Sequence, residues 1–427
     1  MTKCFTSMKI LTVLFMILIL ASVKINAQWD CRSMLGAHLS PLYEKAPVSW
    51  AGEITMASGL LDGHRVTNSL LIFGIDFDFG SGHQMYLEGG YKNYMNILKD
   101  KSQSDKLKSI SNNGLGFREV FYRYFSPDLQ VTAGLQTMTL GDFFLLDERV
   151  LGFKYKQDVS SFSINVSLGT VQKDFARMGD FCGTRKMFYM VKGTKSGDNL
   201  GETNFFGTVI SWDLSKKVDN EKSENDEFES FDEFSEFEES EPFFDQIGIV
   251  FYNEFGSLFK SPKYYYGAGL KVNFPGGIDL EAEVLGQYDY GNRAAIIFLE
   301  SHKNITWTSM GNTAFEAGII GKIKIDEDAV ATPSFSNLYI GEVYRLDTRD
   351  IPIVYASVKH MFPWSSKFFV KAKFIRQIKG KNLTEIDLEA SFRLFKHLKL
   401  TPMLSKIISN PLNEDMLMVR LEARLAI

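Results

Sequence analysis

The sequence predicts an all-β fold: one transmembrane antiparallel β-barrel of about 16 strands, with roughly 14 to 18 strands compatible with the pattern. Aromatic residues make up 14% of the chain, with 36 Phe and 17 Tyr, and this composition favours strands. Several segments alternate between apolar and polar residues over roughly 10–13 residues, which suits a tilted strand that crosses a bilayer. Beyond residue 27 the sequence has no run of roughly 18 apolar residues, so it predicts no transmembrane helix.

The first element is a predicted signal peptide over residues 1–27. Lys3 and Lys9 give it a positive start, Ile10–Val23 is an apolar run, and Ala27 supplies a small residue before the cleavage site. This order is typical of a cleaved secretory signal. The alternative is a short membrane anchor, but the apolar run is short for a span. We therefore expect an exported mature chain, residues 28–427, folded as a single barrel.

The strands are predicted where the alternation is clearest. Each of these segments places apolar residues on one face and polar or charged residues on the other. They are Leu129–Gln136, Ser161–Gly169, Ser366–Gly380, Leu383–Phe395 and Met416–Ile427. An exported β-sandwich or jelly roll is the alternative, but so many long, one-sided strands favour a barrel.

The connections between the predicted strands fall into two kinds. Short turns are expected at residues 126–128, 274–277, 362–366 and 395–397. Longer polar connections are expected around residues 96–113, 171–185 and 291–312. Short turns at one end and long loops at the other are typical of transmembrane barrels. The strand count is least certain at 186–215 and 294–311, where the alternation weakens.

The whole expected mature chain resembles Gram-negative outer-membrane β-barrel proteins of the porin-like kind. The resemblance is carried by the signal peptide that ends in NAQ, by strands that end in Tyr or Phe, and by the amphipathic last strand. Ala133–Lys156 is also loosely similar to the strand–loop–strand pattern of porin-like and alginate-export-type barrels. The resemblance implies an outer-membrane location, contact with the lipid bilayer, and passage of a small hydrophilic solute.

Charged residues opposite the apolar faces of the last strands are the candidate lumen lining. They are Lys367, Lys371, Lys373, Glu385, Asp387, Glu389, Arg393, Arg420, Glu422 and Arg424. A turn near residues 380–381 predicts that Lys371 and Lys373 lie opposite Glu389 and Asp387. So many charges in a dry core would cost several kcal/mol each unless all were paired, and a wet lumen removes that cost. The sequence thus predicts a water-filled channel. The alternative is a narrow, non-conducting scaffold plugged by its own salt bridges.

An acidic insert interrupts the strand pattern at residues 217–245. Phe228, Phe231, Phe234 and Phe237 recur every third residue, and residues 221–245 hold 12 acidic residues and one Lys. This charge opposes collapse and predicts a disordered, solvated loop. In the alternative, the insert recruits a protein partner: the phenylalanines anchor in a groove and the carboxylates steer toward a basic surface. Calcium binding is a weaker idea, because the ligand spacing of calcium loops is missing. The sequence alone does not decide which side of the membrane the insert faces.

The remaining candidates for chemistry are few. Cys31 and Cys182 could form a disulfide in an oxidising compartment or remain separate thiols. None of the six His residues lies in a short motif with Ser or an acid, and we expect His360 at a membrane interface. The chain also lacks metal-ligand spacing and a basic patch suited to nucleic acid. We therefore predict no enzyme activity, no cofactor, no metal and no nucleic-acid partner, the alternative being a barrel hydrolase. The segment Gly169–Lys186 is expected to be a surface loop, the alternative being a constriction inside the barrel.

Overall fold

The computed structural model describes residues 47–61, 64–99, 107–140, 145–171, 203–214, 244–256, 262–274, 276–289, 291–324, 326, 352–363, 368–378, 383–394, 397–409 and 416–426. The predicted signal peptide, Cys31, Cys182, Lys367 and the four phenylalanines of the acidic insert lie outside these residues.

The described chain forms one sheet of 18 antiparallel strands. In chain order the strands are β1 (Val48–Leu61), β2 (His64–Gly80), β3 (His83–Lys99), β4 (Leu107–Phe125), β5 (Leu129–Leu140), β6 (Leu146–Val159), β7 (Phe162–Val171), β8 (Thr203–Asp213), β9 (Phe244–Gly256), β10 (Lys263–Phe274), β11 (Ile278–Asp289), β12 (Asn292–Trp307), β13 (Gly311–Lys324), β14 (Ile353–Met361), β15 (Phe368–Gln377), β16 (Leu383–Arg393), β17 (Leu398–Ser409) and β18 (Met416–Ala426). No helix among the described residues is long and apolar enough to cross a membrane.

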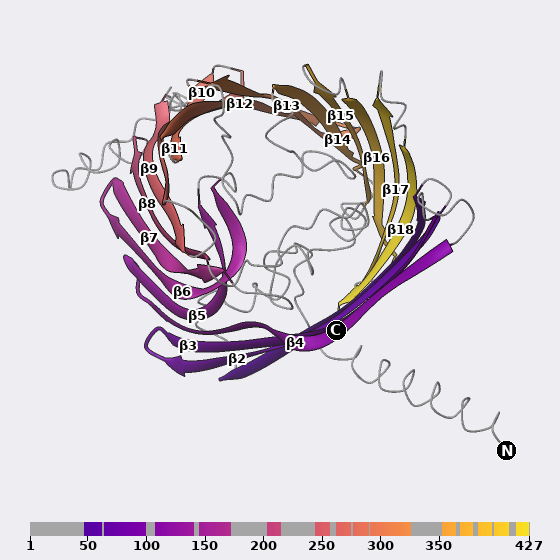
Figure 1. Ribbon diagram of the computed structural model, residues 1–427, viewed down its shortest axis with the longest axis horizontal. Helices are drawn as coiled ribbons and strands as arrows, with labels where there is room; N and C mark the ends of the chain where they lie inside the picture. The colour runs from indigo at the N-terminus through magenta and orange to yellow at the C-terminus, as the bar shows by residue number, and fades with distance from the viewer. Residues whose placement is uncertain are drawn as a thin grey trace, which may run out of the picture.

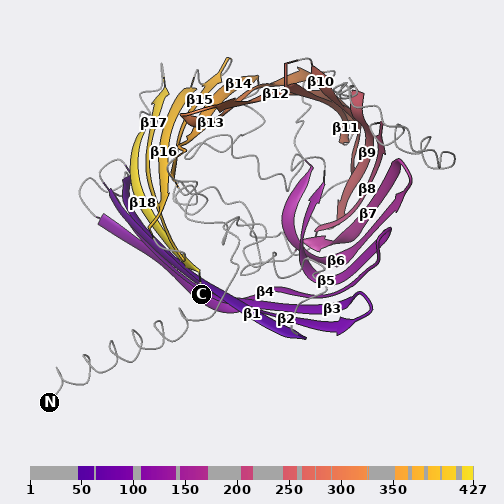
Figure 2. The ribbon, with the colours of Figure 1, turned by 180° about the vertical axis from the view of Figure 1, so that it is seen from behind.

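The sheet closes into a ring. Each strand pairs with the next along the chain, and β1 also pairs with β18 from Glu53↔Ala426 to Leu61↔Met418. Figures 1 and 2 show this ring from opposite ends, with β18 beside the first strands. Closure leaves no free first or last strand, which is how a barrel avoids exposed sheet edges. The predicted fold class is therefore confirmed, with 18 strands where the pattern suggested about 16.

Side chains alternate between the outside and the inside of the ring, as the pleat of a strand requires. On β16, Ile386 is 42% exposed on the outer face, whereas Glu385 on the inner face is 0% exposed. On β18, Val419 and Leu421 lie outside, and Arg420 and Glu422 lie inside. The barrel is thus apolar on its outer face, and its inner face carries most of its charged side chains.

Aromatic side chains stack on the outer face near both ends of the ring. At one end, Phe368 stacks between Phe362 and Phe392, with ring centroids 4.9 and 5.8 Å away. His360 lies at the same end, 2.9 Å from the Thr313 hydroxyl and with its ring against Phe362. At the other end, Tyr264 and Tyr288 face each other at 6.4 Å.

Three connections differ from the sequence-based expectation. Residues 96–99 and 107–113 belong to β3 and β4, and residues 292–307 form the single strand β12, so the predicted long connections at 96–113 and 291–312 were wrong in extent. β9 begins at Phe244, so the last two residues of the predicted insert 217–245 belong to a strand. The strands are longer than expected at these places because they keep pairing beyond the point where the alternation weakens.

The acidic insert connects β8 to β9 at the end of the ring that carries the short turns. In an antiparallel ring, connections alternate between the two ends, so the turns that follow even-numbered strands share one end. These include the turns at residues 81–82, 126–128, 160–161 and 275–277. The Asp78 N–H donates a hydrogen bond to the Pro47 carbonyl, and the Ala426 N–H donates one to the His397 carbonyl. Because Asp78 and His397 lie beside two of these turns, Pro47 and Ala426 lie at this end too.

The tip of the β5–β6 hairpin leaves the wall and bends into the ring. The last described wall pairs are Val120↔Leu135 between β4 and β5, and Val150↔Val171 between β6 and β7. Between them, the described residues from Gln136 to Arg149 pair only across the hairpin itself. Figures 1 and 2 show these two strands curving into the interior.

Candidate functional site

The inner wall of the barrel is the part of the molecule where polar side chains gather. The predicted lining residues Lys371, Lys373, Glu385, Asp387, Glu389, Arg393, Arg420, Glu422 and Arg424 all occupy inward positions of β15, β16 and β18. The register places Lys371 opposite Glu389 and Lys373 opposite Asp387, as the turn predicted. The interior of these strands is therefore charged along most of its height.

The contacts of these residues reach further around the wall than hairpin partners alone. Lys373 Nζ lies 3.4 Å from Glu316 Oε1 on β13, two strands away. Glu316 also accepts a hydrogen bond from the Ser357 hydroxyl at 3.2 Å. On β18, Arg424 Nε lies 2.7 Å from Glu422 Oε1. Neighbouring strands are thus tied together by charge-assisted contacts on the inner face.

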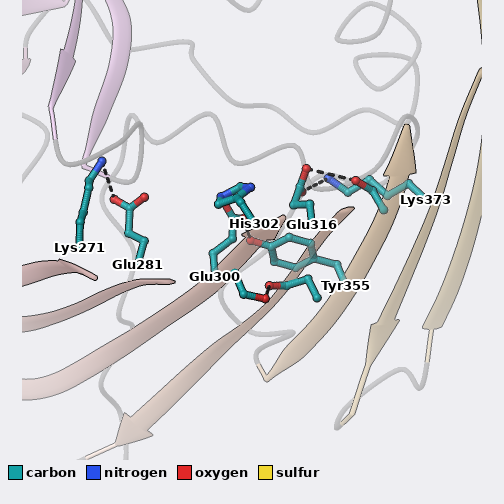
Figure 3. Close-up of polar contacts among 10 residues, drawn as sticks. Lys271, Glu281, Glu300, His302, Glu316, Tyr355 and Lys373 are labelled. Carbon is teal, nitrogen blue, oxygen red and sulfur yellow. Dashed lines mark hydrogen bonds and ion pairs between the residues drawn. The ribbon is translucent and has the colours of Figure 1, made fainter. Parts of the chain in front are cut away.

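A row of polar residues continues from β14 back to β10 (Figure 3). Glu300 contacts His302 Nε2 at 2.6 Å and accepts a hydrogen bond from the Tyr355 hydroxyl. Next to it, Glu281 lies opposite Glu300 in the register and pairs with Lys271 at 3.2 Å. The sequence did not predict this row, because the weak alternation in β12 did not indicate which of its residues face inward.

A second charged cluster fills the inner face of β3 to β6. Arg118 Nη1 lies 2.9 Å from Glu88 Oε1, and both side chains are buried. Glu88 also accepts a hydrogen bond from the Tyr86 hydroxyl at 2.7 Å. Next along the chain, Glu119 contacts Arg149 at 3.4 Å and accepts a hydrogen bond from the Thr137 hydroxyl.

A β-bulge explains how two adjacent charged residues both face inward. The register between β3 and β4 shifts between Glu88 and Gly89, so that Arg118 is the unpaired extra residue of β4. A bulge turns one side chain to the face it would otherwise avoid. Phe117 therefore stays outside while both Arg118 and Glu119 are buried.

The inward hairpin tip packs an apolar surface against the nearby inner wall of β8 and β9. Leu140, Leu145 and Leu146 are buried in one cluster with Phe205 and Tyr252 of β8 and β9. Leu140 lies so close to Gly207 that a β-carbon there would come within 2.6 Å of Leu140 Cδ2. The tip therefore occupies part of the bore at the end opposite the short turns.

Between this apolar contact and the short-turn end, the inner wall of β6 to β11 is hollowed. Two adjoining cavities of ≈ 150 and ≈ 360 Å³ share Val209, Ser211 and Gln246 in their lining. We call the pair the glycine hollow, because Gly248 and Gly269 form its floor. The remaining polar lining comprises Lys156, Asp158, Ser160, Ser161, Ser163, Asn165, Asp213, Lys271, Glu281 and Glu283. Within the described residues, no three His, Cys, Asp or Glu side chains are grouped to hold a metal ion.

The comparisons with known proteins agree with this architecture. No family model matches the chain, and no curated protein matches it. Among solved structures, the chain is similar to a BenF-like porin from Pseudomonas fluorescens Pf-5, with a TM-score of 0.56 and 8% identity over 89% of this chain and 98% of that one. It is also similar to Pseudomonas aeruginosa OccK5 (OpdH), with a TM-score of 0.54 and 10% identity over 89% and 98% of the two chains. A third is P. aeruginosa OpdK with vanillate, at 0.51 and 8% over the same shares. The chain thus has the fold of outer-membrane porins.

Proposed function

We propose that this chain is an outer-membrane β-barrel that forms a water-filled channel for small hydrophilic solutes. The observation that carries the proposal is the closed 18-stranded ring with an apolar outer face, a charged inner face and a hollowed bore. Barrels with about 16 to 18 strands leave room for an aqueous channel. The proposed role is transport and not catalysis.

The height of the outer apolar band supports insertion in a membrane. The outward residues Tyr264 and Phe274 mark the two ends of β10. Ten residues at about 3.3 Å each, tilted by about 45°, span about 23 Å across the membrane. This matches the apolar band of about 25 Å that outer-membrane barrels present to lipid. Aromatic stacks at both ends agree with the aromatic girdles of such barrels.

The orientation follows from the turns. Outer-membrane barrels place short turns in the periplasm and longer loops outside, so we propose that the short-turn end is periplasmic. The acidic insert is attached at that end, and its proposed location is the periplasm. Export through the predicted signal peptide, residues 1–27, belongs to the same proposal.

The alternative is a non-conducting barrel that recruits a partner through the acidic insert. The inward hairpin and the buried ion pairs favour this alternative, because they fill part of the bore. The cavities along β6 to β11 favour the channel. Single-channel recording of the refolded chain in a planar bilayer decides between the two. Steady openings that disappear on heating support a channel, and a folded, inserted barrel without current refutes it.

A further inference from the structure

The floor of the glycine hollow is built from small residues on neighbouring strands. Gly248 of β9 pairs with Gly269 of β10, and Ser211 of β8 pairs with Gly248 on its other side. All three occupy inward positions, on the same face as the buried residues Tyr252 of β9 and Tyr265 of β10. The two tyrosines lie closer to the end opposite the short turns. The inner face therefore carries little side-chain volume at these three positions.

Neither glycine is required by the backbone. Their φ angles lie outside the left-handed region, since positive φ is found at other glycines and not at these two. A β-carbon on Gly248 would meet nothing closer than the Ile210 carbonyl oxygen at 3.9 Å. On Gly269 it would meet the Ala282 oxygen at 3.6 Å and Glu283 Cγ at 4.0 Å. A larger residue would therefore fit both positions.

Glycine within a strand weakens it and often marks a place where a ligand comes close to the backbone. Gly207, one strand away, shows the structural use of glycine, because Leu140 of the hairpin occupies the space of its side chain. At Gly248 and Gly269 the same space belongs to the cavity. The space that a side chain would fill is thus left to whatever enters the hollow.

The polar groups around the floor favour a solute that forms hydrogen bonds and carries no negative charge. Two lysine–carboxylate pairs flank it: Lys156 with Asp158 at 3.0 Å and Lys271 with Glu281 at 3.2 Å. Because these charges neutralise each other, they present donors and acceptors without a strong field of either sign. The lining also contains Asp213 and Glu283, so acidic groups outnumber basic ones and an anion gains no net attraction.

We propose that the glycine hollow binds an uncharged, polyhydroxylated solute of about monosaccharide size, and that Gly248 and Gly269 keep it clear for that solute. Gly248 and Gly269 line the smaller cavity of ≈ 150 Å³, which adjoins the larger one of ≈ 360 Å³. The larger cavity falls in the range of roughly 300–1,000 Å³ found for small-molecule sites. Hydroxyl, amide and carboxylate groups on its wall match the donors and acceptors of a sugar. This inference rests on the proposed channel function and names the substrate class of that channel.

The test measures the ion current of the full chain in a planar bilayer while glucose is titrated. Gluconate, glucosamine and vanillate serve as an anionic sugar analogue, a cationic one and an aromatic carboxylate. We expect glucose to reduce or interrupt the current at lower concentrations than the other three. A current that glucose leaves unchanged, or that gluconate, glucosamine or vanillate blocks more strongly, overturns the inference while the channel function stands. A silent barrel overturns both.

Two variants place the effect at the hollow. Gly248→Leu and Gly269→Leu fill its floor and should weaken glucose block by about tenfold or more, since a few hydrogen bonds are lost. Gly269→Ala adds a single methyl group that makes only ordinary van der Waals contacts, and it should give a smaller loss. The test therefore survives if the leucine variants fold poorly. The matched control is Gly321→Leu on the outer face of β13, where a β-carbon meets nothing closer than Ile297 at 3.9 Å. Equal weakening of block in this control contradicts the proposed site.

Discussion

Arg118 is a fully buried cation, 0% exposed, on the inner face of the barrel. Its partner Glu88 is 4% exposed, and Glu119 follows it directly in the chain. A buried charge is tolerated only while its counter-charge stays in place. The cluster therefore holds β3 and β4 together as a unit, and its members depend on one another.

Replacing Arg118 by Met should destabilise the barrel by about 3–5 kcal/mol, because Glu88 is left as a buried carboxylate without its cation. The measurement is the free energy of unfolding in guanidinium chloride, followed by tryptophan fluorescence. The matched control is Arg293→Met, whose ion pair with Asp326 is 58% and 32% exposed. That change should cost about 0–1 kcal/mol, as exposed ion pairs do. Equal losses in the two variants contradict a structural role for the buried pair.

Lys373 contributes a positive charge to the inner wall of the barrel, which is the lumen of the proposed channel. Replacing it by Met removes the cation 3.4 Å from Glu316, so the lumen becomes more negative and should favour cations. We expect the reversal potential in a KCl gradient to move toward that of potassium. Lys303→Met is the control, because Lys303 pairs in register with the outward residues Ile278 and Phe315. A shift in the control as large as that of Lys373→Met would mean that the charges on the inner wall do not set selectivity.

At the scale of single elements, the alternation predicted β5, β7, β15, β16 and β18 well and β8 and β12 poorly. The reason is the inward hairpin. Phe205 of β8, and Ala294 and Ile296 of β12, are apolar inward residues in the buried cluster that contains Leu140 of the tip. Where the lumen wall contacts protein in place of water, both faces of a strand become apolar and the period of two disappears.

The bulge at Arg118 and the course of the hairpin were also beyond sequence-based prediction. A bulge changes which face a residue occupies without changing the composition of the strand. The hairpin keeps its own pairing and only loses its neighbours. Both features change the register or the neighbours of a strand without changing its pattern of residues. The lysine–carboxylate pairs of β15 and β16 could be predicted from the sequence because they lie across one hairpin.

Replacing Leu140 by Asp should release the hairpin tip from the wall. Leu140 is buried beside Gly207 and Tyr252, and burial of a carboxylate there is strongly unfavourable. We expect a larger and noisier single-channel conductance, since the tip no longer stays packed inside the bore. Thr139→Asp is the control, because residue 139 faces the other side of the same hairpin. An unchanged conductance for Leu140→Asp would show that the tip does not limit the current.

The short turns offer a test of backbone strain. Gly276 and Gly311 both adopt positive φ, at 89° and 101°. An alanine methyl at residue 276 meets nothing within 4 Å, whereas at residue 311 it overlaps the carbonyl oxygen of Met361. Gly276→Ala should cost about 1–2 kcal/mol for the left-handed backbone alone. Gly311→Ala should cost clearly more, as measured by guanidinium unfolding, and a smaller loss would contradict the described turn.

At the scale of the whole molecule, the sequence predicted a barrel but not the end at which its insert lies. To place the insert, one must know whether the strand before it is even- or odd-numbered. This depends on whether the weak stretches 203–213 and 292–307 count as one strand each. The structure makes both of them single strands. The insert then shares an end with the short turns.

Deletion of residues 221–241 should leave the channel intact, because the deletion removes only the connection and spares β8 and β9. We expect the same single-channel conductance and the same unfolding midpoint as for the full chain. Capture of periplasmic proteins by the full chain and the deleted chain, compared side by side, tests the recruiting role. Loss of conductance in the deleted chain would contradict the separation of pore and insert.

The pairing of β1 with β18 forms the seam that closes the ring, and it constrains how the barrel assembles. It joins residues from the two ends of the described chain, Glu53 with Ala426, and contacts so distant in sequence form slowly. Until the seam closes, the free edges of β1 and β18 carry backbone groups without partners, and lipid offers them none. In the proposed outer-membrane barrel, assembly therefore has to wait for the last strand, and a chain that lacks β18 is expected not to complete its insertion.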